Sequence, residues 1–138
     1  MTVERTFVDT NVLLYAYDHG AGVKHERAAA ALTELWSARA GVLSTQVLQE
    51  FVVNARKKQQ APDAAIVRVV GAYRAWDVWR PEVDDVLAAV SSASTNQMSF
   101  WDALIVVCAA RLGATRLYTE DLNHGQVIGG VRVVNPLL

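Results

Sequence analysis

Short apolar runs alternate along the chain with longer segments in which apolar residues recur at helical spacing. The short runs predict β-strands at residues 4–8, 41–44, 75–79, 115–118 and 131–134. The longer segments predict α-helices at residues 11–17, 24–39, 46–58, 62–74, 82–94 and 100–112. Alternating strands and helices are typical of an α/β fold. The pattern therefore predicts a central, short-stranded parallel sheet with helices on both faces.

Residues that start or stop helices support several of these boundaries. Ser99 predicts the start of helix 100–112 because its hydroxyl can accept a hydrogen bond from a free backbone N–H, and Gly113 predicts its end. Pro62 suits the first turn of helix 62–74. Segments 18–22 and 95–99 predict loops. Helix 100–112 is apolar nearly all round, so we expect it to be buried.

Composition predicts one globular domain over residues 1–138. The chain has 138 residues, of which 52% are hydrophobic and 20% charged, enough for a single sizeable core. The longest unbroken apolar stretch, residues 103–110, is far too short to cross a bilayer.

The first residues and the cysteine content favour a cytoplasmic protein. Residues 1–5 lack the basic-then-apolar layout of a secretory signal. Cys108 is the only cysteine, which suits a reducing compartment, and it forms no zinc pattern with the three histidines. The net charge of −1 argues against a large nucleic-acid footprint, although a metal could supply positive charge at a small site.

Four acidic residues point to chemistry. Asp9 comes directly after a predicted strand, Asp121 comes three residues after the end of another, and Asp102 opens the buried helix. The carboxyl ends of parallel strands share one crevice, so we expect these side chains to meet there. Glu50 joins them if the polar face of helix 46–58 looks into the crevice. Gathered carboxylates repel one another unless they are protonated or hold a cation, so the pattern predicts a metal site.

Each acidic residue also has a simpler structural explanation. Asp9 can cap a helix, and Asp102 can complement the positive end of a helix dipole. Asp121 sits in a segment with the composition of an ordinary turn. Glu50 lies away from the apolar stripe of its helix, as a solvated charge would. The joint pattern is therefore more informative than any one residue.

Four segments around these residues resemble, in order, the motifs of PIN-domain nucleases. The segments are 8–16 around Asp9, 44–51 around Glu50, 99–105 around Asp102 and 117–125 around Asp121. Together they extend over nearly the whole chain, and four motifs in register are far more specific than one. The resemblance implies a PIN-like fold in which the four acidic residues are catalytic and bind metal.

Within that family, a stand-alone domain of this size is similar to the VapC toxins of type II toxin–antitoxin pairs. This resemblance implies an endoribonuclease that depends on Mg²⁺ or Mn²⁺, a VapB-like antitoxin as partner, and a homodimer. It gives supporting polar roles to Asn11 and Thr119, and the spacing from Thr119 favours Asp121 over Glu120. Mg²⁺ prefers oxygen ligands and can activate water for phosphodiester hydrolysis, which fits these residue types.

The densest basic run is formed by Arg56, Lys57 and Lys58. At the end of a predicted helix, these side chains would complement the helix dipole. The alternative is that they contact RNA phosphates beside the crevice.

Two other function classes are also compatible with part of the pattern. A phosphatase-like phosphoryl-transfer domain would use Asp9 as a covalent phosphate acceptor. Such domains offer a lysine near a late strand, whereas Lys24, Lys57 and Lys58 all lie earlier in this chain. A catalytically inactive PIN-fold binding module is the other alternative. Metal-dependent RNA cleavage distinguishes all three.

Overall fold

One six-stranded sheet runs through the computed structural model, which describes residues 2–138. The strands are β1 (Thr6–Val8), β2 (Gly41–Ser44), β3 (Asp77–Trp79), β4 (Arg116–Tyr118), β5 (Val127–Ile128) and β6 (Val131–Val134), in the order β3-β2-β1-β4-β6-β5. In the parallel centre of the sheet, Phe7 lies beside Val42 on one side and Leu117 on the other. All three side chains are fully buried, so β1, β2 and β4 form the middle of the core.

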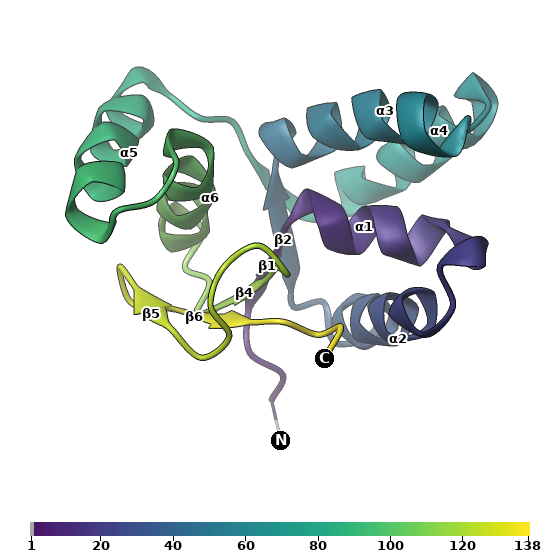
Figure 1. Cartoon of the computed structure of the whole chain (residues 1–138), viewed down its shortest axis with the longest axis horizontal. Coiled ribbons are helices and arrows are strands. Elements are labelled where there is room, and N and C mark those ends of the chain that lie inside the picture. The colour runs from purple at the N-terminus through teal and green to yellow at the C-terminus, as the bar shows by residue number, and fades with distance from the viewer. Residues whose placement is uncertain (1) are drawn as a thin grey trace.

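Six α-helices flank this sheet. They are α1 (Thr10–Tyr17), α2 (Val23–Ala38), α3 (Thr45–Gln59), α4 (Asp63–Ala72), α5 (Val83–Asn96) and α6 (Phe100–Arg111), with 3-10 turns η1 (His19–Ala21) and η2 (Tyr73–Ala75). The α5–α6 pair lies on one side of the central strands and the α1–α2 pair on the other (Figure 1). Helix α6 is largely buried, as its composition predicted. The α/β fold with helices on both faces is confirmed.

Most predicted boundaries hold, and the differences have local causes. Ser99 caps α6 through a hydrogen bond from the Asp102 N–H, and Gly113 follows with a φ of 72°. Residues 95–96, predicted as loop, belong to α5, which continues until Gln97 adopts left-handed backbone. Residues 73–75 form a 3-10 turn, so β3 begins only at Asp77.

Strand β5 was not predicted, and it is the one antiparallel member of the sheet within residues 2–138. It has only two residues, too few to show an alternating pattern. Gly129 and Gly130 follow it with positive φ angles of 58° and 81°, which turn the chain straight back into β6. The sheet is therefore parallel except at this edge.

The parallel strands bring several chain segments to one edge of the sheet. Asp9 follows β1, Thr45 follows β2 and Thr119 follows β4, so all three lie where strands end. Parallel strands end at the same edge of a sheet, so the helices and the loop that follow these strands begin at that edge. No helix in residues 2–138 has the length and apolar character needed to span a membrane.

Candidate active site at the carboxyl edge of the sheet

Asp9 is a buried carboxylate at the junction of β1 and α1. Its side chain is only 7% exposed, and it caps α1 by accepting a 2.7 Å hydrogen bond from the Thr10 N–H at Oδ1. Oδ2 accepts a 2.9 Å bond from the Thr119 hydroxyl and a longer one from the Asn11 amide. The capping interpretation is thus confirmed, and it leaves the second oxygen directed toward the β4 end.

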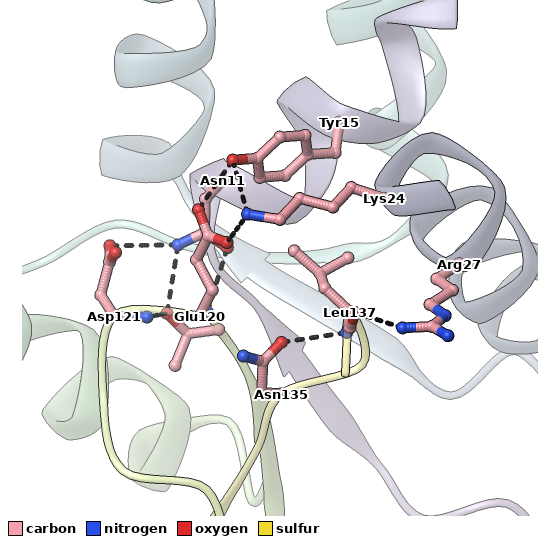
Figure 2. A network of polar contacts seen from close by, with 9 residues as sticks. Asn11, Tyr15, Lys24, Arg27, Glu120, Asp121, Asn135 and Leu137 are labelled. Atoms are coloured by element: carbon pink, nitrogen blue, oxygen red, sulfur yellow. Dashed lines mark hydrogen bonds and ion pairs between the residues drawn. The ribbon is translucent and has the colours of Figure 1, made fainter. Parts of the chain in front are cut away.

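Asn11 and Thr119 connect Asp9 to the loop after β4. The Asn11 amide nitrogen donates to the Thr119 hydroxyl at 3.2 Å and to Asp121 Oδ2 at 3.1 Å. The buried Thr119 hydroxyl also accepts a bond from the Asp121 N–H at 3.1 Å. Figure 2 shows Asn11 directed at Asp121 and at the Thr119–Asp121 loop. The supporting polar positions therefore lie between two of the acidic residues.

Glu50 reaches the same region from α3. Its Oε2 accepts a 2.9 Å bond from the Thr10 hydroxyl, and its Oε1 accepts a 3.0 Å bond from the Gln46 amide. Thr10 stands next to Asp9 on the first turn of α1, so Glu50 is one side chain away from the buried carboxylate. Glu50 is half-buried and hydrogen-bonded rather than a free solvated charge.

Thr10 and Gln46 are site residues that the sequence did not single out. Both are buried, and each satisfies one oxygen of Glu50. Gln46 had a visible signal, since it precedes Glu50 by four residues and shares its helix face. Thr10 had none beyond its place next to Asp9.

Asp102 lies in the first turn of α6, where the helix dipole favours an anion. Burial, together with the charges of Asp121 and Glu50, raises the pKa of Asp102, against a lowering contribution from Ser99. Asp102 therefore shares its electrostatic environment with those two carboxylates.

Glu120 and Asp121 are neighbours in sequence but have different partners. Glu120 accepts hydrogen bonds from the Tyr15 hydroxyl at 3.0 Å and from Lys24 Nζ at 3.1 Å. Asp121 is exposed and is held by Asn11. Figure 2 shows Tyr15 and Lys24 approaching Glu120, with Asp121 on the other side of Asn11. This arrangement favours Asp121 as the acidic residue of the site.

The electrostatics of the cluster suit a cation. Burial is the largest cause that raises the pKa of Asp9, to about 6, and the charges of Asp121 and Glu50 add to it. Among residues 2–138, no ion pair involves Asp9, Glu50, Asp102 or Asp121. The four carboxylates therefore repel one another without a basic side chain to neutralise them.

The donor set fits a hard divalent ion, although the side chains do not enclose one. Carboxylate oxygens are the ligands that Mg²⁺ and Mn²⁺ prefer. Within residues 2–138, no three His, Cys, Asp or Glu side chains lie close enough to hold a metal ion together. Mg²⁺ retains several water molecules when bound, so carboxylates that do not enclose the ion can still hold it partly through water.

The basic run lies at the other end of α3 from the site. Arg56 forms a two-pronged ion pair with Asp63, with both N–O distances at 2.9 Å. Lys57 and Lys58 are exposed in the last turn of the helix. Their position complements the helix dipole, and an RNA contact by these three residues stays a prediction.

Solved structures of toxin–antitoxin proteins share this fold. A toxin–antitoxin complex from Klebsiella pneumoniae aligns with a TM-score of 0.71 and 23% identity over 95% of this chain and 97% of that one. VapC20 from Mycobacterium tuberculosis, described as a toxin that cleaves the sarcin–ricin loop, aligns with a TM-score of 0.69 and 21% identity over 92% and 98%. The DNA-bound VapBC complex of Salmonella typhimurium aligns with a TM-score of 0.65 and 18% identity, over 95% of this chain and 97% of that one.

The family assignment comes from the sequence itself. No curated protein sequence matches the chain significantly. The family model of the PIN domain matches residues 6–129, which include all four acidic residues and every strand of the sheet except β6. The chain therefore belongs to the PIN-domain family.

Proposed function

We propose that this protein is an endoribonuclease that depends on Mg²⁺ or Mn²⁺ and acts as the toxin of a toxin–antitoxin pair. The observation that carries the proposal is the buried Asp9 carboxyl, whose pKa is raised to about 6 within a set of carboxylates that lacks a basic counter-charge. A protein keeps such a costly arrangement where a cation is to be bound. The VapC neighbours, one of which cleaves the sarcin–ricin loop, support RNA as the substrate.

The residues take distinct roles in this proposal. Asp9, Asp102, Asp121 and Glu50 would hold the metal, in part through its bound water molecules. Asn11 and Thr119 orient Asp9 and Asp121 through the hydrogen bonds described above. Thr10 and Gln46 hold the Glu50 carboxylate in place. When bound, the metal would lower the pKa of an attacking water and stabilise the leaving oxygen of the phosphodiester.

Cleavage of RNA by the purified protein tests the proposal directly. We expect endonucleolytic products from structured and unstructured RNA in the presence of Mg²⁺ or Mn²⁺, and none in EDTA. Addition of excess Mn²⁺ should restore cleavage to the EDTA-treated sample. Cleavage that persists in EDTA would contradict the metal mechanism, and no cleavage under any condition would favour the inactive binding module.

Metal affinity should depend on pH through Asp9. A carboxyl must lose its proton to bind a cation, so we expect Mn²⁺ affinity to fall up to about tenfold for each pH unit below about 6. Calorimetric titration with Mn²⁺ at pH about 5 and about 7.5 measures this. The Asp9→Asn variant serves as control, since it should bind weakly and show a smaller pH dependence, which then comes from the remaining carboxyls such as Asp102.

The same pKa shift affects stability in the opposite direction without metal. The unfolded Asp9 loses its proton near pH 4, before the folded one does near pH 6. The metal-free protein should therefore lose the stabilisation that the Asp9 carboxyl adds to its free energy of unfolding as the pH rises from about 4 through about 6.

The affinity for Mn²⁺ provides the contradicting outcome. Wild-type affinity that is constant across this pH window would contradict the assignment of Asp9 as a metal ligand.

The proposed partner is a VapB-like antitoxin that covers the carboxylate crevice, and the proposed assembly is a homodimer in the cytoplasm. An arginine from the antitoxin would match carboxylate oxygens in pairs and compete with the metal. Expression of the chain alone should arrest growth, and co-expression of the neighbouring small gene should relieve the arrest. Normal growth while soluble, RNA-cleaving protein accumulates would instead indicate a housekeeping nuclease.

A phosphoryl-transfer function is less compatible with the geometry. Both oxygens of Asp9 already accept hydrogen bonds from Thr10 and Thr119. Lys24 is bound to Glu120 rather than to Asp9. Failure of the protein to incorporate phosphate from an acyl-phosphate donor would exclude this alternative.

A further inference from the structure

Lys24 stands at the rim of the acidic site. It lies near the start of α2, and its Nζ donates to Glu120 Oε2 at 3.1 Å and to the Tyr15 hydroxyl at 3.4 Å. The ammonium also lies 4.9 Å from the centre of the Tyr15 ring. Half of the side chain, 49%, is still exposed. The amine is therefore held in one place while facing solvent.

Lys24 also differs from the other paired basic residues by its location. Residues 2–138 contain five ion pairs, and the other four join Arg5 to Asp77, Arg56 to Asp63, Arg111 to Asp85 and Arg132 to Glu4. None of those four touches the Thr119–Asp121 loop. Among the described residues, Lys24 is thus the paired cation that contacts the loop carrying Asp121.

An RNA substrate creates a need for such a cation. The phosphates of RNA approach a region dominated by carboxylates. The basic run at the end of α3 lies about 10 Å along the helix from Glu50, so it does not place positive charge at the site itself. Arg56 in that run is already bound by Asp63. A positive charge at the rim, paired with the residue that precedes Asp121, would offset repulsion where a phosphate enters.

The Lys24 contacts leave capacity for a phosphate. An ammonium has three N–H donors, and Glu120 and Tyr15 occupy two of them. Glu120 has a second partner in the Tyr15 hydroxyl, at 3.0 Å, so its carboxylate stays hydrogen-bonded if Lys24 turns toward RNA. The pair is also partly exposed, and such pairs exchange partners easily.

We propose that Lys24 binds a backbone phosphate of the RNA at the entrance to the site, with Glu120 and Tyr15 holding the amine in position. This inference rests on the proposed ribonuclease function and adds a substrate contact to it. Phosphate contacts position nucleic acid without reading its sequence. Lys24 would therefore set how RNA lies beside Asp121, and sequence preference would come from other residues.

The test compares four variants by RNA binding and by cleavage. Binding of a labelled, mixed-sequence, single-stranded oligoribonucleotide is measured by fluorescence anisotropy in EDTA over a series of KCl concentrations. Cleavage of the same oligonucleotide in Mn²⁺ gives KM and kcat. The variants are Lys24→Gln, Glu120→Gln, Lys58→Gln from the basic run, and Arg68→Gln as an exposed control on α4.

Loss of a phosphate contact has a specific signature. Lys24→Gln should weaken binding about two- to fivefold at low salt, and reduce the slope of log affinity against log salt by about 0.7. KM should rise by a similar factor with kcat nearly unchanged. Glu120→Gln removes the competing charge but keeps a polar side chain, so it should bind RNA as tightly as the wild type or more tightly. Arg68→Gln should behave like the wild type.

Two results would overturn the inferred phosphate contact of Lys24 without contradicting the proposed ribonuclease function. If Lys24→Gln and Glu120→Gln both lower kcat and leave the slope of log affinity against log salt unchanged, the pair only stabilises the Thr119–Asp121 loop. If Lys58→Gln reduces the slope and Lys24→Gln does not, RNA lies along the end of α3 instead. A wild-type protein that neither binds nor cleaves RNA would overturn the proposed function itself.

Discussion

Replacement of Asp9 by Asn should lower the rate of RNA cleavage by about a hundredfold or more while the protein stays folded. The substitution removes the charge that a cation needs. It also removes the cost of burying that charge, which is the main reason for the raised pKa of Asp9, and the smaller repulsion from Asp121 and Glu50. Asn is as good a helix cap as Asp, so the bond from the Thr10 N–H to the side chain can persist. Single-turnover cleavage in Mn²⁺ measures the loss.

A thermal melt of the same variant separates catalysis from capping. In EDTA, Asp9→Asn should melt at or above the wild-type temperature, because a buried carboxylate is exchanged for a neutral amide. Asp102→Asn, at the start of α6, is the matched variant, and it should also lose cleavage without unfolding. If Asp9→Asn melts much earlier and retains cleavage, Asp9 is mainly a structural cap.

The sequence predicted those features that depend on neighbouring residues. The bounds of β2 and β6 match the predicted segments, because both are short segments rich in apolar residues and each is followed by a polar residue. The positions of Asp9 and Asp121 after strands follow from the same local pattern. Convergence of these residues then follows from the parallel sheet, whose strand ends share one edge.

The features that could not be predicted depend on contacts between distant segments. The Glu50 side chain is held by Thr10 across 40 residues, and Glu120 is held by Lys24 across 96 residues. No periodicity within α1, α2 or α3 shows which polar side chains will face another element. The short strand β5 depends likewise on pairing with β6, since two residues carry no pattern of their own.

Asp85 is another residue that the sequence did not single out, and we expect its replacement to cause a large loss of stability. It is 2% exposed, at the third position of α5, where the pattern predicted only an ordinary helix start. Its Oδ2 accepts bonds from the Glu82 N–H at 2.8 Å and the Trp79 indole at 2.9 Å. Oδ1 accepts a 2.8 Å bond from Arg111 of α6. One carboxylate thus joins the end of β3, the start of α5 and the end of α6.

Asp85→Ala should lower the free energy of unfolding by about 3 kcal/mol, because it leaves buried donors without an acceptor. Urea denaturation followed by circular dichroism measures the change. Asp63→Ala is the control, since Asp63 is also paired with an arginine, but its side chain is 70% exposed and its loss should change stability far less. Equal effects from the two variants would show that burial of Asp85 carries no special weight.

The pH dependence of stability gives an independent check on Asp85. Burial alone would raise the pKa of Asp85, but the bonds from Glu82, Trp79 and Arg111 outweigh it and hold the pKa below its ordinary value. The stabilisation from this carboxylate is therefore complete above the unfolded pKa of about 4, and it is lost as the pH falls through the lower folded pKa. The stability difference between wild type and Asp85→Ala should accordingly be largest near neutral pH and shrink in acid. A difference that grows on acidification would mean that the folded protein holds Asp85 in its protonated form, and the three-donor account would then be wrong.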